Sequence, residues 1–90
     1  MKDTARAVVT VIGKDTVGIL AKVSTACAES NANVIEVTQS VLEEFFCMIM
    51  IIDIKEANRQ LDELQAAIQA KVPEMQVHVM HENIFNSMHR

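Results

Sequence analysis

The sequence lacks tryptophan and tyrosine, and three phenylalanines supply its aromatic rings apart from those of histidine. Half of its 90 residues are nevertheless hydrophobic, so the core has to be built from aliphatic side chains and from the six methionines. A chain of this length buries roughly 60% of its unfolded surface, which leaves a small margin of stability that self-association would increase. We therefore expect a single domain over residues 1–90 that associates with itself.

Positive charge is also scarce. Eight lysines and arginines face twelve aspartates and glutamates, the net charge is −4, and no basic cluster occurs. Because nucleic-acid binding depends on lysine and arginine contacts to phosphates, this composition excludes that class of partner. No apolar run approaches the ~20 residues of a membrane span. The first six residues also lack the apolar segment of a signal peptide. We expect a cytoplasmic protein without membrane contact.

Residues that carry catalytic or metal chemistry are few. Cys27 and Cys47 form no CxxC motif and have no basic neighbour, which is typical of reduced, buried thiols. His78 and His81 lie at an odd spacing, which on a strand sends them to opposite faces and away from a common metal. The methionines are expected as core and interface filler rather than as soft-metal ligands. We therefore expect no enzyme activity, no metal and no cofactor.

Glycine occurs only at positions 13 and 18, and both lie in the stretch VVTVIGKDTVGIL, Val8 to Leu20. Its β-branched start predicts a strand, and the apolar spacing after Gly18 predicts a helix. A strand that passes through such a turn into a helix leaves unpaired backbone N–H groups, which suit a carboxylate or phosphate. The alternative is a plain turn in which Asp15 or Thr16 only caps the helix.

Hydrophobic periodicity predicts the remaining elements. The predicted strands are Ala5–Ile12, Val34–Leu42, Phe45–Ile52 and Met75–His81, and the predicted helices are Gly18–Ser30, Asn58–Val72 and Glu82–Met88. Asn31 to Asn33 ends the first helix, since asparagine tolerates the left-handed conformation of a C-cap. Asn58 is the predicted N-cap of the second helix, and Pro73 stops that helix. This order predicts an α+β fold, a ferredoxin-like βαββαβ sandwich. It has a four-stranded antiparallel sheet with two helices on one face, plus a short C-terminal helix.

The third predicted strand, FFCMIMII, is apolar on both faces. Because both long helices cover the same face of the sheet, one half of this strand has to face away from them. That half is either Phe46, Met48, Met50 and Ile52 or Phe45, Cys47, Ile49 and Ile51. Another subunit, the C-terminal helix with Ile84, Phe85 and Met88, or both have to cover it. The strand therefore predicts a homodimer or a larger homo-oligomer.

The segment GKDTVGILAKVSTACAESNANV resembles the amino-acid-binding ACT domain. Its pattern is a strand ending in G-x-D-x-x-G-I/L, an amphipathic helix, and a polar turn into an Asn-Ile/Val strand start. The later segment IEVTQSVLEEFFCMIM is similar to stand-alone, single-domain members of this family. Its first part also resembles the regulatory halves of the glycine-cleavage repressor and of formyltetrahydrofolate deformylase. The resemblance covers nearly the whole chain.

The resemblance implies that chains pair and hold a small amino acid between them. It implicates Gly13, Asp15, Thr16, Val17, Gly18 and Asn33 in ligand binding. Backbone N–H groups near Thr16 would hold the carboxylate, Asp15 would accept from the ammonium group, and Asn33 can serve either end. The structural alternative is that Asp15 only caps the helix and Asn33 only closes the turn after it. Two departures stand out, since some ligand-binding members have histidine at position 13 and many have proline at position 17.

Two functions follow from this sequence. The first is a regulatory module that senses an amino acid at a homodimer interface and modulates a partner, which Asp15 and Asn33 favour. The alternative is an interaction or regulatory subunit that keeps the fold without a ligand, which Gly13 favours. Asp15 and Asn33 flank a helix and lie about 20 Å apart at 1.5 Å per residue, so the first function needs a second subunit.

Overall fold

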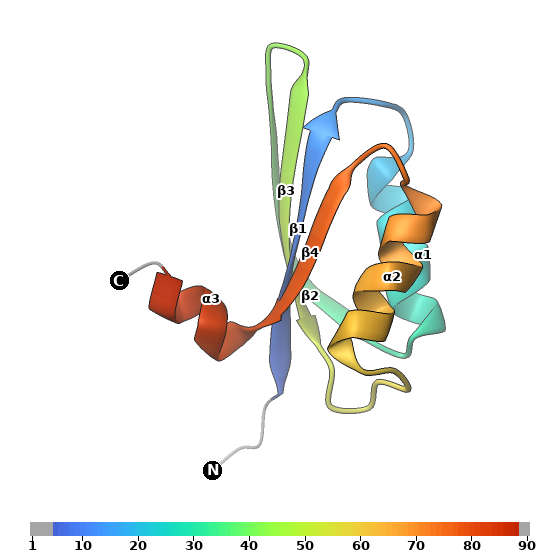
Figure 1. The fold of residues 1–90 in the computed structure, drawn as a ribbon, viewed down its shortest axis with the longest axis vertical. Coiled ribbons are helices and arrows are strands. Elements are labelled where there is room, and N and C mark those ends of the chain that lie inside the picture. Colours follow the sequence, from blue (N-terminus) through green and yellow to red (C-terminus); the bar gives the residue numbers. More distant parts are fainter. Residues whose placement is uncertain (1–4, 89–90) are drawn as a thin grey trace.

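The computed structural model describes residues 5–88, which form seven helices and strands. They are β1 (Arg6–Lys14), α1 (Ile19–Glu29), β2 (Asn33–Leu42), β3 (Phe45–Asp53), α2 (Leu61–Lys71), β4 (Gln76–His81) and α3 (Glu82–Met88). The four strands form an antiparallel sheet in the order β2-β3-β1-β4. Helices α1 and α2 lie on one face of it, and α3 projects from the opposite face (Figure 1). The predicted ferredoxin-like arrangement is confirmed.

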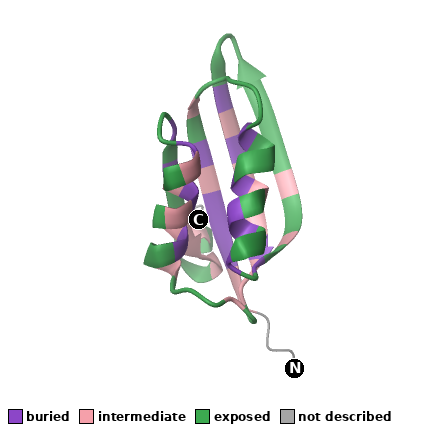
Figure 2. Ribbon diagram, turned by 90° about the vertical axis from the view of Figure 1, so that its right-hand side faces the viewer, coloured by how far each residue is buried: buried purple, intermediate pink, exposed green. Residues whose placement is uncertain are grey.

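The core lies between the sheet and the two long helices. Every second residue of β1 and β3 faces these helices. These strand residues pack against the apolar side of α1 and α2, while the other side of each helix is exposed to solvent (Figure 2). The largest fully buried side chains of the core are Met48, Met50, Ile52, Leu64 and Ile68, all 0% exposed. This settles the two orientations that the sequence left open for β3. Phe46, Met48, Met50 and Ile52 face the helices, and Phe45, Cys47, Ile49 and Ile51 face away.

Strand β1 continues through Gly13 instead of breaking there. Gly13 pairs with Phe46, and Lys14 pairs with Phe45, so the strand ends two residues later than the sequence predicted. A side chain at position 13 would place its Cβ 2.8 Å from the Met75 sulfur. The glycine therefore serves close packing inside the strand, and the chain turns only after Lys14.

Both long helices begin at other caps than those predicted. Gly18 is the N-cap of α1 in a left-handed conformation (φ 86°), and no side chain caps this helix, so neither Asp15 nor Thr16 has the predicted capping role. Helix α2 begins after Gln60, whose backbone N–H donates to Glu63 Oε1 at 2.9 Å in a capping box. The side-chain amide of Asn58, the predicted cap, instead donates to the Glu29 carbonyl at 3.3 Å.

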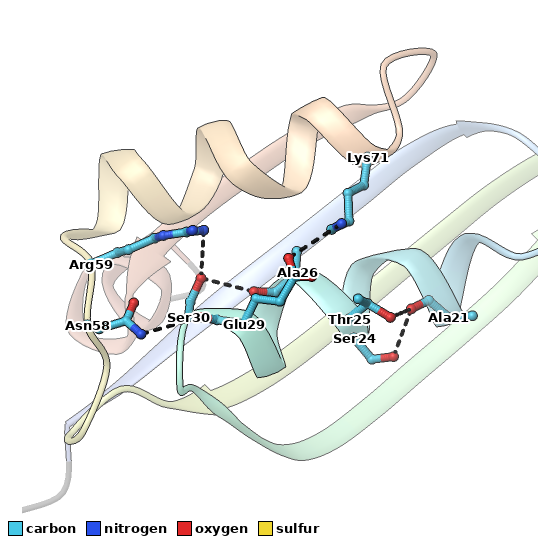
Figure 3. A network of polar contacts seen from close by, with 9 residues as sticks. All are labelled: Ala21, Ser24, Thr25, Ala26, Glu29, Ser30, Asn58, Arg59 and Lys71. Atoms are coloured by element: carbon cyan, nitrogen blue, oxygen red, sulfur yellow. Dashed lines mark hydrogen bonds and ion pairs between the residues drawn. The ribbon is translucent and has the colours of Figure 1, made fainter.

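A polar network ties the end of α1 to the loop before α2 (Figure 3). The buried Ser30 hydroxyl donates to the Ala26 carbonyl at 2.9 Å and accepts from Arg59 Nη1 at 3.1 Å. Asn31 has the positive φ of 58° that the sequence predicted for the helix end. Its amide donates to the Glu56 carbonyl at 2.8 Å. These contacts fix the chain reversal from which β2 starts.

Strand β2 forms one edge of the sheet. A bulge between Val34 and Glu36 breaks its alternation, so Val34 and Val37 both lie opposite helix-facing residues of β3. Regular alternation would place Ile35 on the same face as Val37, but the bulge breaks this relation. Ile35 is 45% exposed. Most of the strand is exposed to solvent.

Candidate functional site

A groove of about 440 Å³ lies beside the turn that leads from β1 into α1. The turn and the first residues of α1 form one wall, and the last part of β2 forms the other. Its lining residues are Asp15, Thr16, Gly18, Ile19, Leu20, Ala21, Gln39, Ser40, Val41 and Phe46. Three of the predicted ligand-binding residues, Asp15, Thr16 and Gly18, thus line one concave surface.

The turn presents both hydrogen-bond donors and an acceptor. The backbone N–H of Asp15 donates to the Glu44 carbonyl at 2.9 Å, which ties the turn to the β2–β3 hairpin. Within residues 5–88, the N–H groups of Thr16, Val17 and Gly18 have no acceptor, and the Asp15 carboxylate has no hydrogen-bond or ion-pair partner. A group with both a negative and a positive end is complementary to this set of unpaired atoms.

Gln39 adds a polar group that the sequence did not assign to the site. It lies opposite Met48, on the side of the sheet that faces the helices, and it is exposed. In the part of the chain that the structure describes, its amide has no hydrogen-bond partner. Its break in the apolar pattern of β2 was visible in the sequence. That signal required a partner for Gln39 without pointing to the groove.

Apolar side chains complete the groove around these polar atoms. Phe46 forms a base that is 5% exposed, while Leu20 on α1 and Val41 on β2 are 39% and 52% exposed. The groove therefore combines a polar end at the turn with an apolar wall, which is the usual make-up of a site for a small organic ligand.

Asn33 lies elsewhere, at the opposite end of β2. It borders a separate hollow of about 400 Å³ that Asn31 and Glu56 also line. Val41 lies eight positions after Asn33 along β2, so at about 3.4 Å per residue the two residues are roughly 27 Å apart. One chain therefore does not bring Asn33 together with Asp15, in agreement with the spacing that the sequence predicted.

The other two predicted residues do not line the groove. Gly13 lies inside β1 against Met75. Val17 is 93% exposed at the tip of the turn, where its side chain contacts solvent.

Cys27 lies in the core, outside the groove. Burial raises the pKa of the Cys27 thiol to about 11, so this cysteine stays protonated at neutral pH. Among residues 5–88, no cluster of three or more histidine, cysteine, aspartate or glutamate side chains could hold a metal ion. Over the same residues, no helix is long and apolar enough to cross a membrane.

Comparisons with known sequences give one consistent group of relatives. A sequence model of the ACT domain matches residues 5–82. A UPF0237 protein of Listeria monocytogenes serotype 4b is 45% identical over 87 residues, which cover 94% of this chain and 98% of that protein. A UPF0237 protein of Methanopyrus kandleri is 42% identical over 87 residues, which cover 94% of this chain and 97% of that protein.

Solved structures share the fold. An ACT domain protein from Streptococcus pneumoniae has a TM-score of 0.76 at 28% identity, covering 92% of this chain and 96% of that chain. A formyltetrahydrofolate deformylase from Pseudomonas syringae has a TM-score of 0.79 at 22% identity, and the match covers 90% of this chain and 28% of that chain. A structure described as a glycine cleavage system transcriptional repressor has a TM-score of 0.63 at 16% identity, and the match covers 89% of this chain and 47% of that chain. The resemblance predicted from the sequence is confirmed.

Proposed function

The chain belongs to the ACT domain family and to the UPF0237 family, and we propose that it is a homodimeric module that senses a small amino acid. The ACT domain is a regulatory domain of the amino-acid-sensing type. In our proposal the amino acid binds in the groove beside the Gly18 turn, between two copies of the chain. Binding then changes how the pair acts on a partner.

The observation that carries this proposal is the set of unpaired polar atoms at one end of the groove. The N–H groups of Thr16 and Gly18, which line the groove, lie at the positive end of the α1 dipole, where an α-carboxylate is favoured. The Asp15 carboxylate is free to accept from an α-ammonium group. The two ends of a zwitterion thus find opposite charges a short distance apart.

The second copy would close the site through the β2 edge. This strand has ten residues and an outer edge to which no strand of residues 5–88 pairs. The other edge strand differs, because the N–H of Val79 in β4 donates to Gln65 Oε1 at 2.8 Å. Long, uncovered edges are rare because they pair with other chains. In the proposed dimer, two β2 strands pair antiparallel about a two-fold axis.

That pairing supplies the missing residue. When two β2 strands run antiparallel, the Asn33 end of one copy lies beside the Val41 end of the other, which borders the groove. Asn33 can then hydrogen-bond either end of the ligand, while Gln39 contacts its side chain. A ligand that contacts both copies would stabilise the dimer by mass action.

The test is a thermal-shift screen of the purified protein against the twenty amino acids. At least one should raise the melting temperature, and Asp15→Ala and Asn33→Ala should each abolish that rise without unfolding the protein. Glu74→Ala and Asn86→Ala are matched controls, because both residues are exposed and lie outside the groove. Full-strength binding of that amino acid to both site variants by calorimetry would refute the site.

A second function is favoured by Gly13. This position offers no side chain to a ligand, and Met75 fills the space where a side chain would lie. If none of the twenty amino acids shifts the melting temperature, the proposed function changes to an interaction or regulatory subunit that keeps the fold without a ligand. Partner binding would then be expected on the same edge.

A further inference from the structure

The face of the sheet opposite α1 and α2, here called the outer face, carries apolar and small polar side chains in its middle and no aspartate, glutamate, lysine or arginine there. Strand pairing arranges its residues in rows across the strands. The two middle rows are Thr38–Ile49–Thr10–His78 and Ser40–Cys47–Ile12–Gln76. Neither row contains aspartate, glutamate, lysine or arginine. A partner can therefore cover the middle of this face without burying an aspartate, glutamate, lysine or arginine side chain.

Charged residues lie only at the two ends of the outer face. Lys14 marks the end next to the β2–β3 hairpin, whose turn carries Glu43 and Glu44. At the other end, Arg6 Nη2 donates to Glu82 Oε2 at 2.6 Å and anchors the start of α3. Glu36 and Asp53 also lie at this end, opposite Ile51 and Arg6. Each end thus carries charges of both signs, as the rim of an interface commonly does.

Helix α3 covers only one end of this face (Figure 1). Val8, near α3, is 1% exposed, and the exposure then rises along the face to 44% at Ile12, 59% at Phe45 and 76% at Leu42. On α3 itself, Ile84 is 56% exposed. The single chain therefore has a projecting helix at one end of the outer face and an uncovered apolar surface at the other.

We propose that the outer face binds the outer face of a second copy, with the two sheets antiparallel, so that α3 of each copy lies against the hairpin end of the other. A two-fold axis parallel to the sheets and perpendicular to the strands produces this arrangement. It places each projecting helix at the end where the other copy has none. The opposite orientation, with parallel strands, would leave both hairpin ends uncovered.

The area of the face fits such an interface. Strands β1, β2 and β3 have nine, ten and nine residues and β4 has six, so the four strands side by side cover roughly 500 Å². With the exposed side of α3 added, the surface approaches the roughly 800 Å² per partner that stable complexes bury. This pairing is separate from the β2 edge, so it stands whether or not an amino acid binds. Together the two interfaces would give a tetramer of two-fold-related dimers.

The first test measures molar mass by light scattering for the full chain and for Ile12→Lys. Ile12 is already 44% exposed in one chain, so the lysine can reach solvent without disturbing the core. Ala66→Lys, on the exposed side of α2, is the matched control. We expect Ile12→Lys to halve the mass, from tetramer to dimer or from dimer to monomer, and Ala66→Lys to leave it unchanged. An unchanged mass for Ile12→Lys, or a monomeric wild type, would overturn the proposal.

The second test checks the orientation with a short bismaleimide cross-linker. Cys47 lies on the outer face next to Ile12, and Ile84→Cys adds a thiol on α3. We expect a covalent dimer for Ile84→Cys that disappears in the double variant Ile84→Cys, Cys47→Ser. A dimer that persists in the double variant, or none in Ile84→Cys, would overturn the antiparallel arrangement. Because neither test uses an amino acid, a failure here is distinguishable from a failure of the proposed sensing site.

Discussion

The two cysteines of this protein differ in environment although both follow apolar patterns. Cys27 is buried on α1, with its sulfur 4.0 Å from the sulfur of Met50, whereas Cys47 is partly exposed on the outer face of β3. Burial raises the pKa of Cys27 from 9.0 to about 11, because the thiolate would lose its hydration inside the core.

We predict that only Cys47 reacts with a thiol reagent at pH 8 in the folded Ile12→Lys variant, in which no second copy covers the outer face. Cys47→Ser should therefore remove nearly all labelling, and Cys27→Ser should leave it unchanged, as measured by absorbance or mass spectrometry. Since the pKa of Cys27 is higher in the folded than in the unfolded chain, its contribution to stability is complete below about pH 9 and is lost as the pH rises towards 11. Fast labelling of Cys27 at pH 8 would contradict its burial.

Single residues also show where sequence reasoning succeeded and failed. Asn31 was expected in a left-handed conformation and has it, because the side chain type and its place after a helix both indicate it. The prediction that Asp15 or Thr16 caps α1 was wrong, although both have suitable side chains. Gly18 is the N-cap, and the turn before it is held by a hydrogen bond from the Asp15 N–H to the Glu44 carbonyl. That contact joins residues far apart in sequence. No local pattern contains it.

At the scale of elements, α3 is short, and few contacts hold it. Its seven residues start at Glu82, which bonds Arg6 of β1, and Phe85 is half-buried. The side chain of Met88 lies outside the part of the chain that the structure describes, so its predicted packing stays a prediction. An isolated helix of this length is unstable in water. Helix α3 therefore depends on contacts with the sheet or with another copy.

We predict that truncation after Glu82 lowers the melting temperature by several degrees. The ion pair with Arg6 is retained in this variant, so the loss comes from apolar contacts of about 1 to 2 kcal/mol. Phe85→Ala in the full chain should reproduce part of the decrease, and the exposed substitution Glu74→Ala, outside α3 and the strands, should have no effect. An unchanged melting temperature on truncation would mean that α3 contributes nothing to stability.

The sequence predicted all seven elements, but not which side of β3 the helices cover. Every residue of FFCMIMII is apolar, so hydrophobicity alone does not distinguish the two faces. The register with β1 decides it, since Val9 and Val11 pair with Met50 and Met48 beneath the helices. Likewise the bulge at Ile35 could not be predicted, because it depends on how β2 pairs with β3.

At the scale of the whole molecule, the single chain leaves apolar surface exposed at the β2 edge and on the outer face. Val41, Leu42 and Phe45 are each more than half exposed, at 52%, 76% and 59%. Surfaces of this kind on a small domain are typical of association sites. Stability and association are then coupled, because the subunit contacts protect only the folded form.

We predict that the melting temperature rises with protein concentration. A hundredfold increase in concentration should raise it by a few degrees, measured by calorimetry at several concentrations, because mass action favours the associated, folded state. Ile12→Lys should weaken this dependence, whereas Ala66→Lys should preserve it. A melting temperature that stays constant while the molar mass falls on dilution would show that association adds no stability.

The separation of Asp15 from Asn33 along α1 and β2 has a consequence for signalling. If each site takes Asp15 from one copy and Asn33 from the other, a symmetric pair holds two equivalent sites, and a lone chain holds none. The apparent affinity for the amino acid then increases with the amount of protein in the cell. Such a sensor responds to the product of two concentrations, its ligand's and its own, and its threshold is set by how strongly the chain is expressed.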